Sequence, residues 1–260
     1  MKAVQLINWP SIVGMLRRKF QDAQPFPHIV LDNFLDLSIA KVAESVFPKP
    51  SDAIWYEYEN PLEKKLACND LAKMPKPLAD IIESLNDSYV AKLLSQISGI
   101  NGLMSDPLLH GGGLHCITSG GKLDIRLDYS IHPKTGLERR VNLIIFLNKR
   151  WKKEYGGYLE FWDDQVKHCI KKVAPIYNRA IIFRTSDVSY HGHPEPLTCP
   201  PEVFRKSLAL YFMTEPRIDT KQRHRVLFVK RPNDPDSEEL DRLRKLRSGL
   251  DTAKDVYKIN

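Results

Sequence analysis

Three residues in the second half of the chain have the types and the order of a metal site that also holds an anion. Asp128 stands in the segment KLDIRLDYS, His191 follows 63 residues later, and Arg205 lies 14 residues beyond His191. A carboxylate and an imidazole are common ligands of divalent transition metals, and the guanidinium fork of arginine matches a carboxylate bidentately. A barrel of short strands could bring both ligands to its open end and place the arginine deeper inside. The pattern therefore indicates a metal site beside a carboxylate-binding site.

The chain from Leu114 onward consists of short apolar segments separated by turn residues, a pattern typical of an antiparallel sandwich or jelly roll. Asp128 lies inside one of these segments, His191 follows another, and Arg205 stands just before the last. Seven strands are expected, at 114–119, 122–130, 139–148, 156–163, 169–175, 179–185 and 207–214.

The first hundred residues have a different pattern, which is mixed and largely helical. Residues 25–36 predict a short strand that enters a turn, followed by a helix capped by Asp36 or Ser38. Residues 75–99 carry apolar side chains at helical spacing, and Gly99 is a suitable end for this helix. The N-terminal part is therefore expected to supply helices that support the strands.

These segments together predict an α+β fold with a mainly β core. The core is a double-stranded β-helix, or jelly roll, with N-terminal helices packed on one face and a charged C-terminal helix. We expect a single domain over residues 1–220, in which residues 1–110 form the helical support and residues 111–216 form the jelly-roll core. Residues 221–260 are expected to form a basic C-terminal extension.

The segment from Gly111 to Pro216 resembles the catalytic core of the prolyl-4-hydroxylase-like branch of the 2-oxoglutarate/Fe(II) oxygenases. The resemblance rests on motifs in the same order: a glycine hairpin before an x-x-Asp strand, NLIIFLNKRW, EYGGYLEFW, AIIF, SYHGHPEPL and RKSLALYF. It implies Fe(II), 2-oxoglutarate and O2 as cofactors, with iron held by His-x-Asp on one strand and a distal histidine on another. It assigns Asp128 and His191 to the metal and Arg205 to the far carboxylate of 2-oxoglutarate.

The chain departs from this family pattern at position 126, where arginine replaces the first iron-binding histidine. Arginine carries a permanent positive charge and offers no lone pair to a metal. Side chains two apart on a strand share a face, so Arg126 and Asp128 are expected to point into the barrel together. A cation about 4 Å from a divalent ion costs roughly 8 kcal/mol at an effective dielectric near 20. We therefore predict that Arg126 pairs with Asp128 at the catalytic position and that ordinary iron binding is badly weakened.

His115 is a candidate for the missing metal ligand. If Gly120 and Gly121 form a two-residue hairpin turn, the strand register places His115 directly opposite Arg126. Directly opposed residues project on the same face of a sheet, so His115 would lie near the vacated ligand position. The alternative is that His115 only packs beside the site.

Four other polar residues near these motifs are expected to have simpler roles. Arg139 and Arg140 are expected as surface charges, and His132 in SIHPKTG as a turn residue. His193 has the right residue type but the wrong place in the motif, so we expect it in a loop or on the substrate side.

Two functions of different kinds fit these residues. The first is an active oxygenase that hydroxylates or otherwise oxidises a small molecule or peptide at an unactivated C–H bond. The alternative is a catalytically inactive pseudo-oxygenase, a binding or regulatory module in which Arg126 serves as an anion hook. Oxidation at an unusual two-ligand iron site is a variant of the first function.

Composition indicates the setting in which this chemistry takes place. At 260 residues the chain can bury a sizeable core. No apolar run approaches the roughly 18 to 20 residues of a membrane span, and the four cysteines are scattered without a CxxC pair. We therefore expect a reduced, cytoplasmic protein without a membrane partner. The net charge of +7 is compatible with an anionic substrate, whereas no nucleic-acid-binding signature accompanies it.

Overall fold

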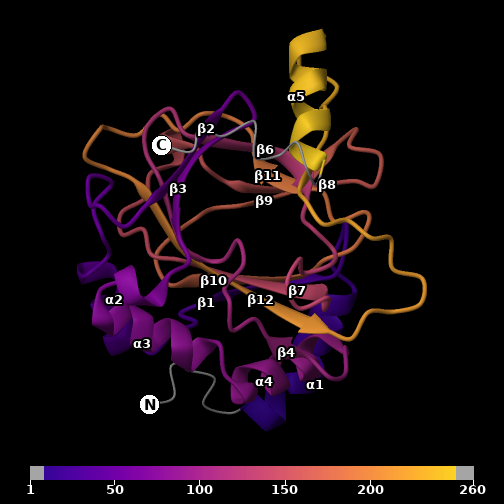
Figure 1. The fold of residues 1–260 in the computed structure, drawn as a ribbon. Coiled ribbons are helices and arrows are strands. Elements are labelled where there is room, and N and C mark those ends of the chain that lie inside the picture. The colour runs from indigo at the N-terminus through magenta and orange to yellow at the C-terminus, as the bar shows by residue number, and fades with distance from the viewer. Residues whose placement is uncertain (1–8, 250–260) are drawn as a thin grey trace.

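A large antiparallel sheet curls into a nearly closed barrel and forms the body of the molecule (Figure 1). The computed structural model describes residues 9–249. Along the sheet the strands follow the order β1-β10-β7-β12-β5-β3-β6-β11-β8-β9, with β13 paired to β6, β2 to β3 and β4 to β12. The predicted jelly roll with a mainly β core is thereby confirmed. The strands are β1 (His28–Asp32), β2 (Tyr56–Asn60), β3 (Glu63–Cys68), β4 (Met104–Ser105), β5 (Gly113–Ile117), β6 (Lys122–Leu127), β7 (Glu138–Phe146), β8 (Leu159–Trp162), β9 (Cys169–Val173), β10 (Arg179–Arg184), β11 (His191–His193), β12 (Arg205–Thr214) and β13 (Leu227–Phe228).

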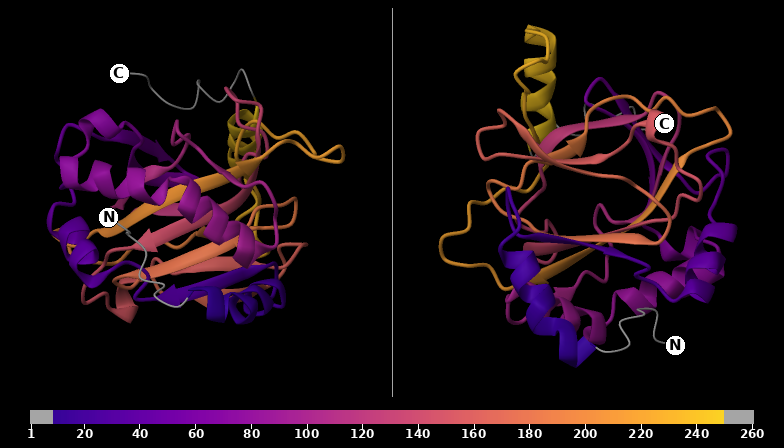
Figure 2. Two further views of the ribbon diagram at one scale, coloured as in Figure 1. Left: turned by 90° about the horizontal axis from the view of Figure 1, so that it is seen from below. Right: turned by 180° about the vertical axis from the view of Figure 1, so that it is seen from behind.

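Four helices cover one outer face of the barrel (Figure 2): α1 (Trp9–Gln21), α2 (Leu37–Ser45), α3 (Lys76–Leu85) and α4 (Ser88–Ser98). The strands behind them, β7, β10 and β12, are buried along almost their whole length, and each contains a central apolar run. The main core lies between these helices and strands, and its buried side chains include Phe20, Leu78, Leu94, Leu143, Ile182 and Leu210.

The helix predicted over residues 75–99 is in fact two helices. α3 ends at Leu85, and Asp87 caps α4 by accepting a hydrogen bond of 2.8 Å from the backbone N–H of Val90. Aspartate competes for backbone donors and therefore favours a cap over a helix interior. Gly99 ends α4 in the left-handed conformation with φ 71°, as expected.

A β-hairpin inside the N-terminal half changes how the barrel closes. β2 and β3 pair with each other, and β3 lies between β5 and β6. His115 therefore lies opposite Ala67 on β3, and the predicted direct pairing of His115 with Arg126 is wrong. Gly113 makes room for β3, since a Cβ atom there would lie 2.1 Å from a carbonyl oxygen of that strand. The first 110 residues thus supply a barrel strand as well as helices.

The C-terminal extension packs against the barrel near β3. β13 pairs with β6, and α5 (Glu238–Ser248) begins after Ser237, whose side chain caps the backbone N–H of Leu240. Arg247, in the last turn of α5, forms an ion pair of 2.9 Å with Glu63 on β3. The extension and the hairpin therefore border the same end of the barrel. None of the helices within residues 9–249 is long and apolar enough to cross a membrane.

Candidate active site

Asp128 and His191 come together at one end of the barrel. Asp128 follows the end of β6, and His191 begins β11, which pairs with β6. Nε2 of His191 lies 3.4 Å from Oδ2 of Asp128. Nδ1 of His191 donates to the carbonyl oxygen of Ser189 at 2.8 Å, which leaves a lone pair on Nε2. Burial lowers the pKa of His191 although Asp128 opposes this shift, so the ring is neutral at pH 7, as a metal ligand must be.

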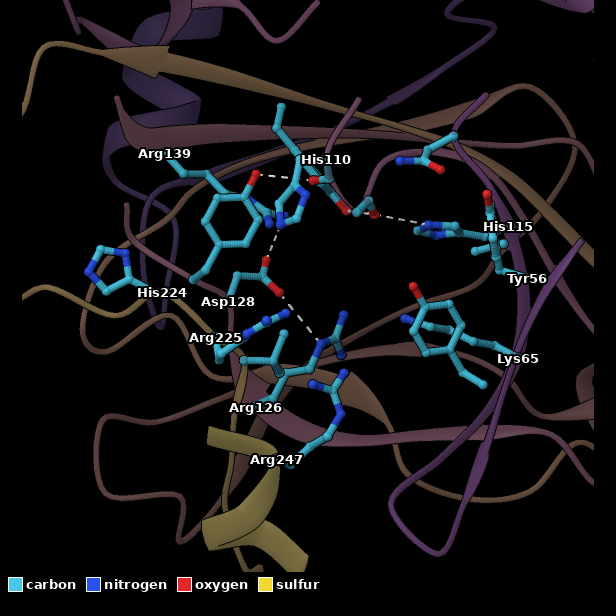
Figure 3. Close-up of a pocket in the computed structure, with 17 residues that line it drawn as sticks. Tyr56, Lys65, His110, His115, Arg126, Asp128, Arg139, His224, Arg225 and Arg247 are labelled. Atoms are coloured by element: carbon cyan, nitrogen blue, oxygen red, sulfur yellow. Dashed lines mark hydrogen bonds and ion pairs between the residues drawn. The ribbon is translucent and has the colours of Figure 1, made fainter. Parts of the chain in front are cut away.

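The carboxylate of Asp128 is surrounded by donors from the protein (Figure 3). Nη2 of Arg139 lies 2.8 Å from Oδ2, and Asn142 donates to the same oxygen at 2.9 Å. Nε of Arg126 lies 3.5 Å from Oδ1. Burial alone would raise the pKa of Asp128, but Arg139, His191 and Arg126 together hold it well below its usual range. Asp128 is thus the anion at the centre of a buried ion-pair network.

Arg126 lies against both candidate metal ligands. Besides its contact with Asp128, its Nη1 donates to the backbone carbonyl of His191 at 3.3 Å. Within residues 9–249, no group of three or more His, Cys, Asp or Glu side chains is arranged to hold a metal. Asp128 and His191 are residues that fit an iron site. The position of the third protein ligand does not fit, because it holds the guanidinium group of Arg126, which cannot coordinate a metal.

His115 does not complete the ligand set in this structure. Its Nε2 lies 3.1 Å from the carbonyl oxygen of Gly111, so the ring is held toward that loop. Removal from water lowers the pKa of His115 to about 3, with Lys65 adding to the shift and Arg126 contributing less. The side chain lines the same cavities as Arg126, as a neutral neighbour of the site.

Arg205 closes the inner end of the barrel cavity. Its side chain is buried, its Nε donates to the carbonyl oxygen of Gly157 at 2.9 Å, and its guanidinium lies 4.8 Å from the centre of the Phe146 ring. In the described part of the chain, no carboxylate forms an ion pair with it. Burial, together with the charge of Arg126, lowers the pKa of Arg205 to about 9. A buried guanidinium without a protein anion is suited to bind a carboxylate from a ligand.

Several residues of the site have other roles than those expected from sequence. Arg139 is buried beside Asp128 and Arg140 is buried beside Thr214, so the expectation that both are surface charges is wrong. The signal that could have found them is their place in a strand whose other residues are buried, where a charge needs a partner. His132 is a buried turn residue whose Nδ1 accepts hydrogen bonds from the turn backbone.

His193 was expected in a loop or on the substrate side, and the structure places it on a strand that borders the inner cavity. It ends β11, only 3% of its surface is exposed, and it lines the inner cavity together with Arg205. Neither ring nitrogen has a hydrogen-bond partner in the structure. Burial and the nearby charge of Arg205 hold the pKa of His193 well below its usual value. A neutral imidazole with free polar atoms thus stands beside the carboxylate-binding arginine.

A cavity of about 460 Å³ opens outward from the space beside Asp128 and His191, which is the expected metal position (Figure 3). It is lined by the β2–β3 hairpin, by the loop before β5 and by the C-terminal extension. Arg126 and Asp128 form part of its wall and of the inner cavity's wall, so the two spaces meet at the metal position. The side chains that the hairpin and the extension contribute include Tyr56, Tyr58, Lys65, Arg225 and Arg247.

Residues 112–213 match the family model of the 2OG-Fe(II) oxygenase superfamily. This match covers the strands that carry Asp128, His191 and Arg205, and it confirms the resemblance inferred from the sequence motifs. Members of the superfamily use Fe(II), 2-oxoglutarate and O2, which are the cofactors that the resemblance implied.

A curated protein that is similar to this chain is a prolyl hydroxylase. The chain is 26% identical over 195 residues to the mouse prolyl 3-hydroxylase OGFOD1, a match that covers 74% of this chain and 33% of the relative. The chain therefore spans about a third of the length of that curated relative.

Solved structures show the same fold. A Trichoplax adhaerens prolyl hydroxylase in complex with a hypoxia inducible factor peptide aligns with a TM-score of 0.57 at 18% identity, covering 80% of this chain and 92% of that one. A Pseudomonas putida prolyl-4-hydroxylase aligns with a TM-score of 0.53 at 15% identity, covering 77% and 100% respectively. The family whose model matches residues 112–213 consists of oxygenases, which agrees with the expectation of an enzyme.

Proposed function

We propose that this chain is a prolyl-hydroxylase-like oxygenase with an atypical metal site, acting on a small molecule or a peptide. The observation that carries the proposal is the convergence of Asp128, His191 and Arg205 on one barrel cavity. In the family, iron and 2-oxoglutarate supply the oxidising chemistry. The residues of this chain hold the cosubstrate through Arg205 and keep His191 neutral and oriented. We further propose a reducing, cytoplasmic setting, which the four free cysteines support.

Replacing Arg205 by glutamine should weaken the binding of 2-oxoglutarate. Charge-assisted hydrogen bonds contribute about 1.5 to 3 kcal/mol, which corresponds to a loss of roughly tenfold to hundredfold in affinity. Equilibrium dialysis with labelled 2-oxoglutarate measures the change. The exposed Arg242 on α5 offers a matched control, and Arg242→Gln should leave the affinity unchanged. If Arg205→Gln and the parent chain bind 2-oxoglutarate with equal affinity, the cosubstrate does not bind at Arg205.

Anaerobic addition of excess Fe(II) and 2-oxoglutarate should give a visible metal-to-ligand charge-transfer absorption. The absorption requires that the cosubstrate chelate iron held by the protein, so it tests the atypical metal site directly. Because Arg126 repels a divalent ion, the absorption should develop only at high iron concentration. Its absence even at a large excess of iron contradicts the oxygenase proposal.

A second candidate function is a pseudo-oxygenase that binds a ligand without redox chemistry. The observation that favours it is that the carboxylate of Asp128 already forms ion pairs with Arg126 and Arg139. Metal analysis of protein purified without oxygen separates the two functions. Stoichiometric iron retained through dialysis would contradict the pseudo-oxygenase.

A further inference from the structure

The two cavities that meet at Arg126 carry an excess of positive charge. Their carboxylates are few: Asp128 lies in the wall, and Glu63 lies behind it, where it pairs with Arg247 and Lys65. In the described lining of the two cavities, six cationic side chains stand against one carboxylate, that of Asp128. The six cationic side chains are Lys65, Arg126, Arg139, Arg205, Arg225 and Arg247.

Part of this charge faces the cavities instead of protein partners. Nε of Arg225 is buried and has no hydrogen-bond partner in the structure. Arg205 has a backbone carbonyl as its hydrogen-bond partner and no protein carboxylate beside it within residues 9–249. A buried guanidinium without a carboxylate beside it is costly, so the position of Arg205 favours the binding of an anion. Figure 3 shows Arg126, Arg225 and Arg247 gathered on the same side of the outer cavity as Asp128.

Arg126 is placed to contact such an anion at the metal position. Its Nε lies toward Asp128 and its Nη1 toward the carbonyl of His191, at long distances of 3.5 and 3.3 Å. Its guanidinium lines the inner cavity that Arg205 closes and the outer cavity that contains Arg225. The donor fork is therefore only loosely engaged by the protein and stands between the two spaces.

We propose that in the metal-free chain Arg126 is the cation that binds one end of a dicarboxylate, so that binding of 2-oxoglutarate does not require iron. The proposal rests on the proposed function in one point, the assignment of the other carboxylate to Arg205. In an iron-dependent site, the carboxylate and the 2-oxo group both contact the metal. In this chain the guanidinium of Arg126 meets the carboxylate alone, as a bidentate donor.

This change of cation alters the ligand preference of the cavity. A guanidinium recognises a carboxylate and gains little from a neighbouring ketone, whereas chelation of a metal needs the ketone. Glutarate, which has the same five-carbon chain and two carboxylates but no 2-oxo group, should therefore bind about as well as 2-oxoglutarate. 2-Oxobutyrate, which has the ketone and a single carboxylate, should bind poorly.

Calorimetric titration of the full chain in the presence of EDTA tests the proposal. We expect saturable binding of 2-oxoglutarate, with glutarate within about threefold of it. 2-Oxobutyrate should bind at least tenfold more weakly, because one charge-assisted pair is lost. Arg126→Gln should lose about tenfold or more for both dicarboxylates, and Arg126→Lys should be intermediate because it keeps the charge without the fork. Arg242→Gln serves as the control for a change of net charge, and thermal melting establishes that each variant is folded.

The outcomes separate this proposal from the proposed function. Binding that appears only when Fe(II) is added overturns the metal-free site and leaves the oxygenase intact. Undiminished metal-free binding in both Arg126→Gln and Arg126→Lys overturns the role of Arg126. If Arg205→Gln binds as well as the parent chain, the cosubstrate anchor fails, and with it the proposed function.

Discussion

Replacement of Arg126 by histidine should raise the affinity of the chain for Fe(II) by at least a hundredfold. The change removes a cation 3.5 Å from Asp128 and adds an imidazole at the position of the missing ligand. The repulsion between a guanidinium and a divalent ion at about 4 Å is roughly 8 kcal/mol at an effective dielectric near 20. One third of that value, about 2.7 kcal/mol, already corresponds to a hundredfold change in affinity. Anaerobic equilibrium titration with Fe(II) measures the gain.

A second variant separates the loss of repulsion from the gain of a ligand. Arg126→Gln removes the charge without supplying an imidazole, so its affinity should lie between those of the parent chain and Arg126→His. His191 and Asp128 are already arranged to complete the site, since His191 presents the lone pair of Nε2 toward Asp128. An Arg126→His variant with unchanged iron affinity would show that the defect extends beyond position 126.

Replacement of Asp128 by asparagine should lower the free energy of unfolding by about 3 to 5 kcal/mol, the usual effect of removing one partner of a buried ion pair. The variant leaves Arg139, whose surface is 4% exposed, without the carboxylate that lies 2.8 Å from it. If Asp128 served only as a metal ligand, its replacement would leave the stability of the metal-free chain almost unchanged. Urea denaturation in the presence of EDTA distinguishes the two cases.

Two controls sharpen the test at Asp128. Asp80→Asn, at the exposed pair with Lys76, should change stability little, because an exposed pair is screened by water. Adding Arg139→Met to Asp128→Asn should restore part of the stability, since it removes the buried positive charge that has lost its carboxylate partner. If Asp128→Asn unfolds at the same urea concentration as the parent chain, Asp128 does not hold the network together.

The same network gives a pH dependence of known sign. The pKa of Asp128 in the folded chain is well below its usual value, which is about 3.9 in the unfolded chain. The stabilisation by Asp128 is therefore present above about pH 4 and is lost as the pH falls through the folded pKa. The acid limb of the stability curve should accordingly be shallower in Asp128→Asn than in the parent chain.

The sequence placed three candidate site residues in the second half of the chain, and the structure brings them to one cavity. Asp128, His191 and Arg205 occupy the ordered motifs of the second half. Apolar alternation there located the seven predicted strands but missed the short strand β11, which carries His191. The ion pair of Arg126 with Asp128 followed from their spacing on one strand and is present at 3.5 Å.

The sequence did not predict the strand that comes from the other half of the chain. Tyr56 and Tyr58 alternate with Glu57 and Glu59, which is a strand pattern, but nothing local indicates that the following strand inserts between β5 and β6. Pairing of this kind depends on the packing of the whole barrel. For the same reason the register of His115 was wrong, and the burial of Arg139 beside Asp128 was missed.

β3 also determines how the protein can be divided. It separates β5 from β6, although it precedes both in the sequence by a stretch that includes two helices. A fragment restricted to the stretch that matches the family model would leave the facing edges of β5 and β6 open, and open strand edges promote aggregation. The borders of the family domain are therefore not the borders of a folding unit. The barrel closes only by a long-range pairing, a kind of contact that slows folding.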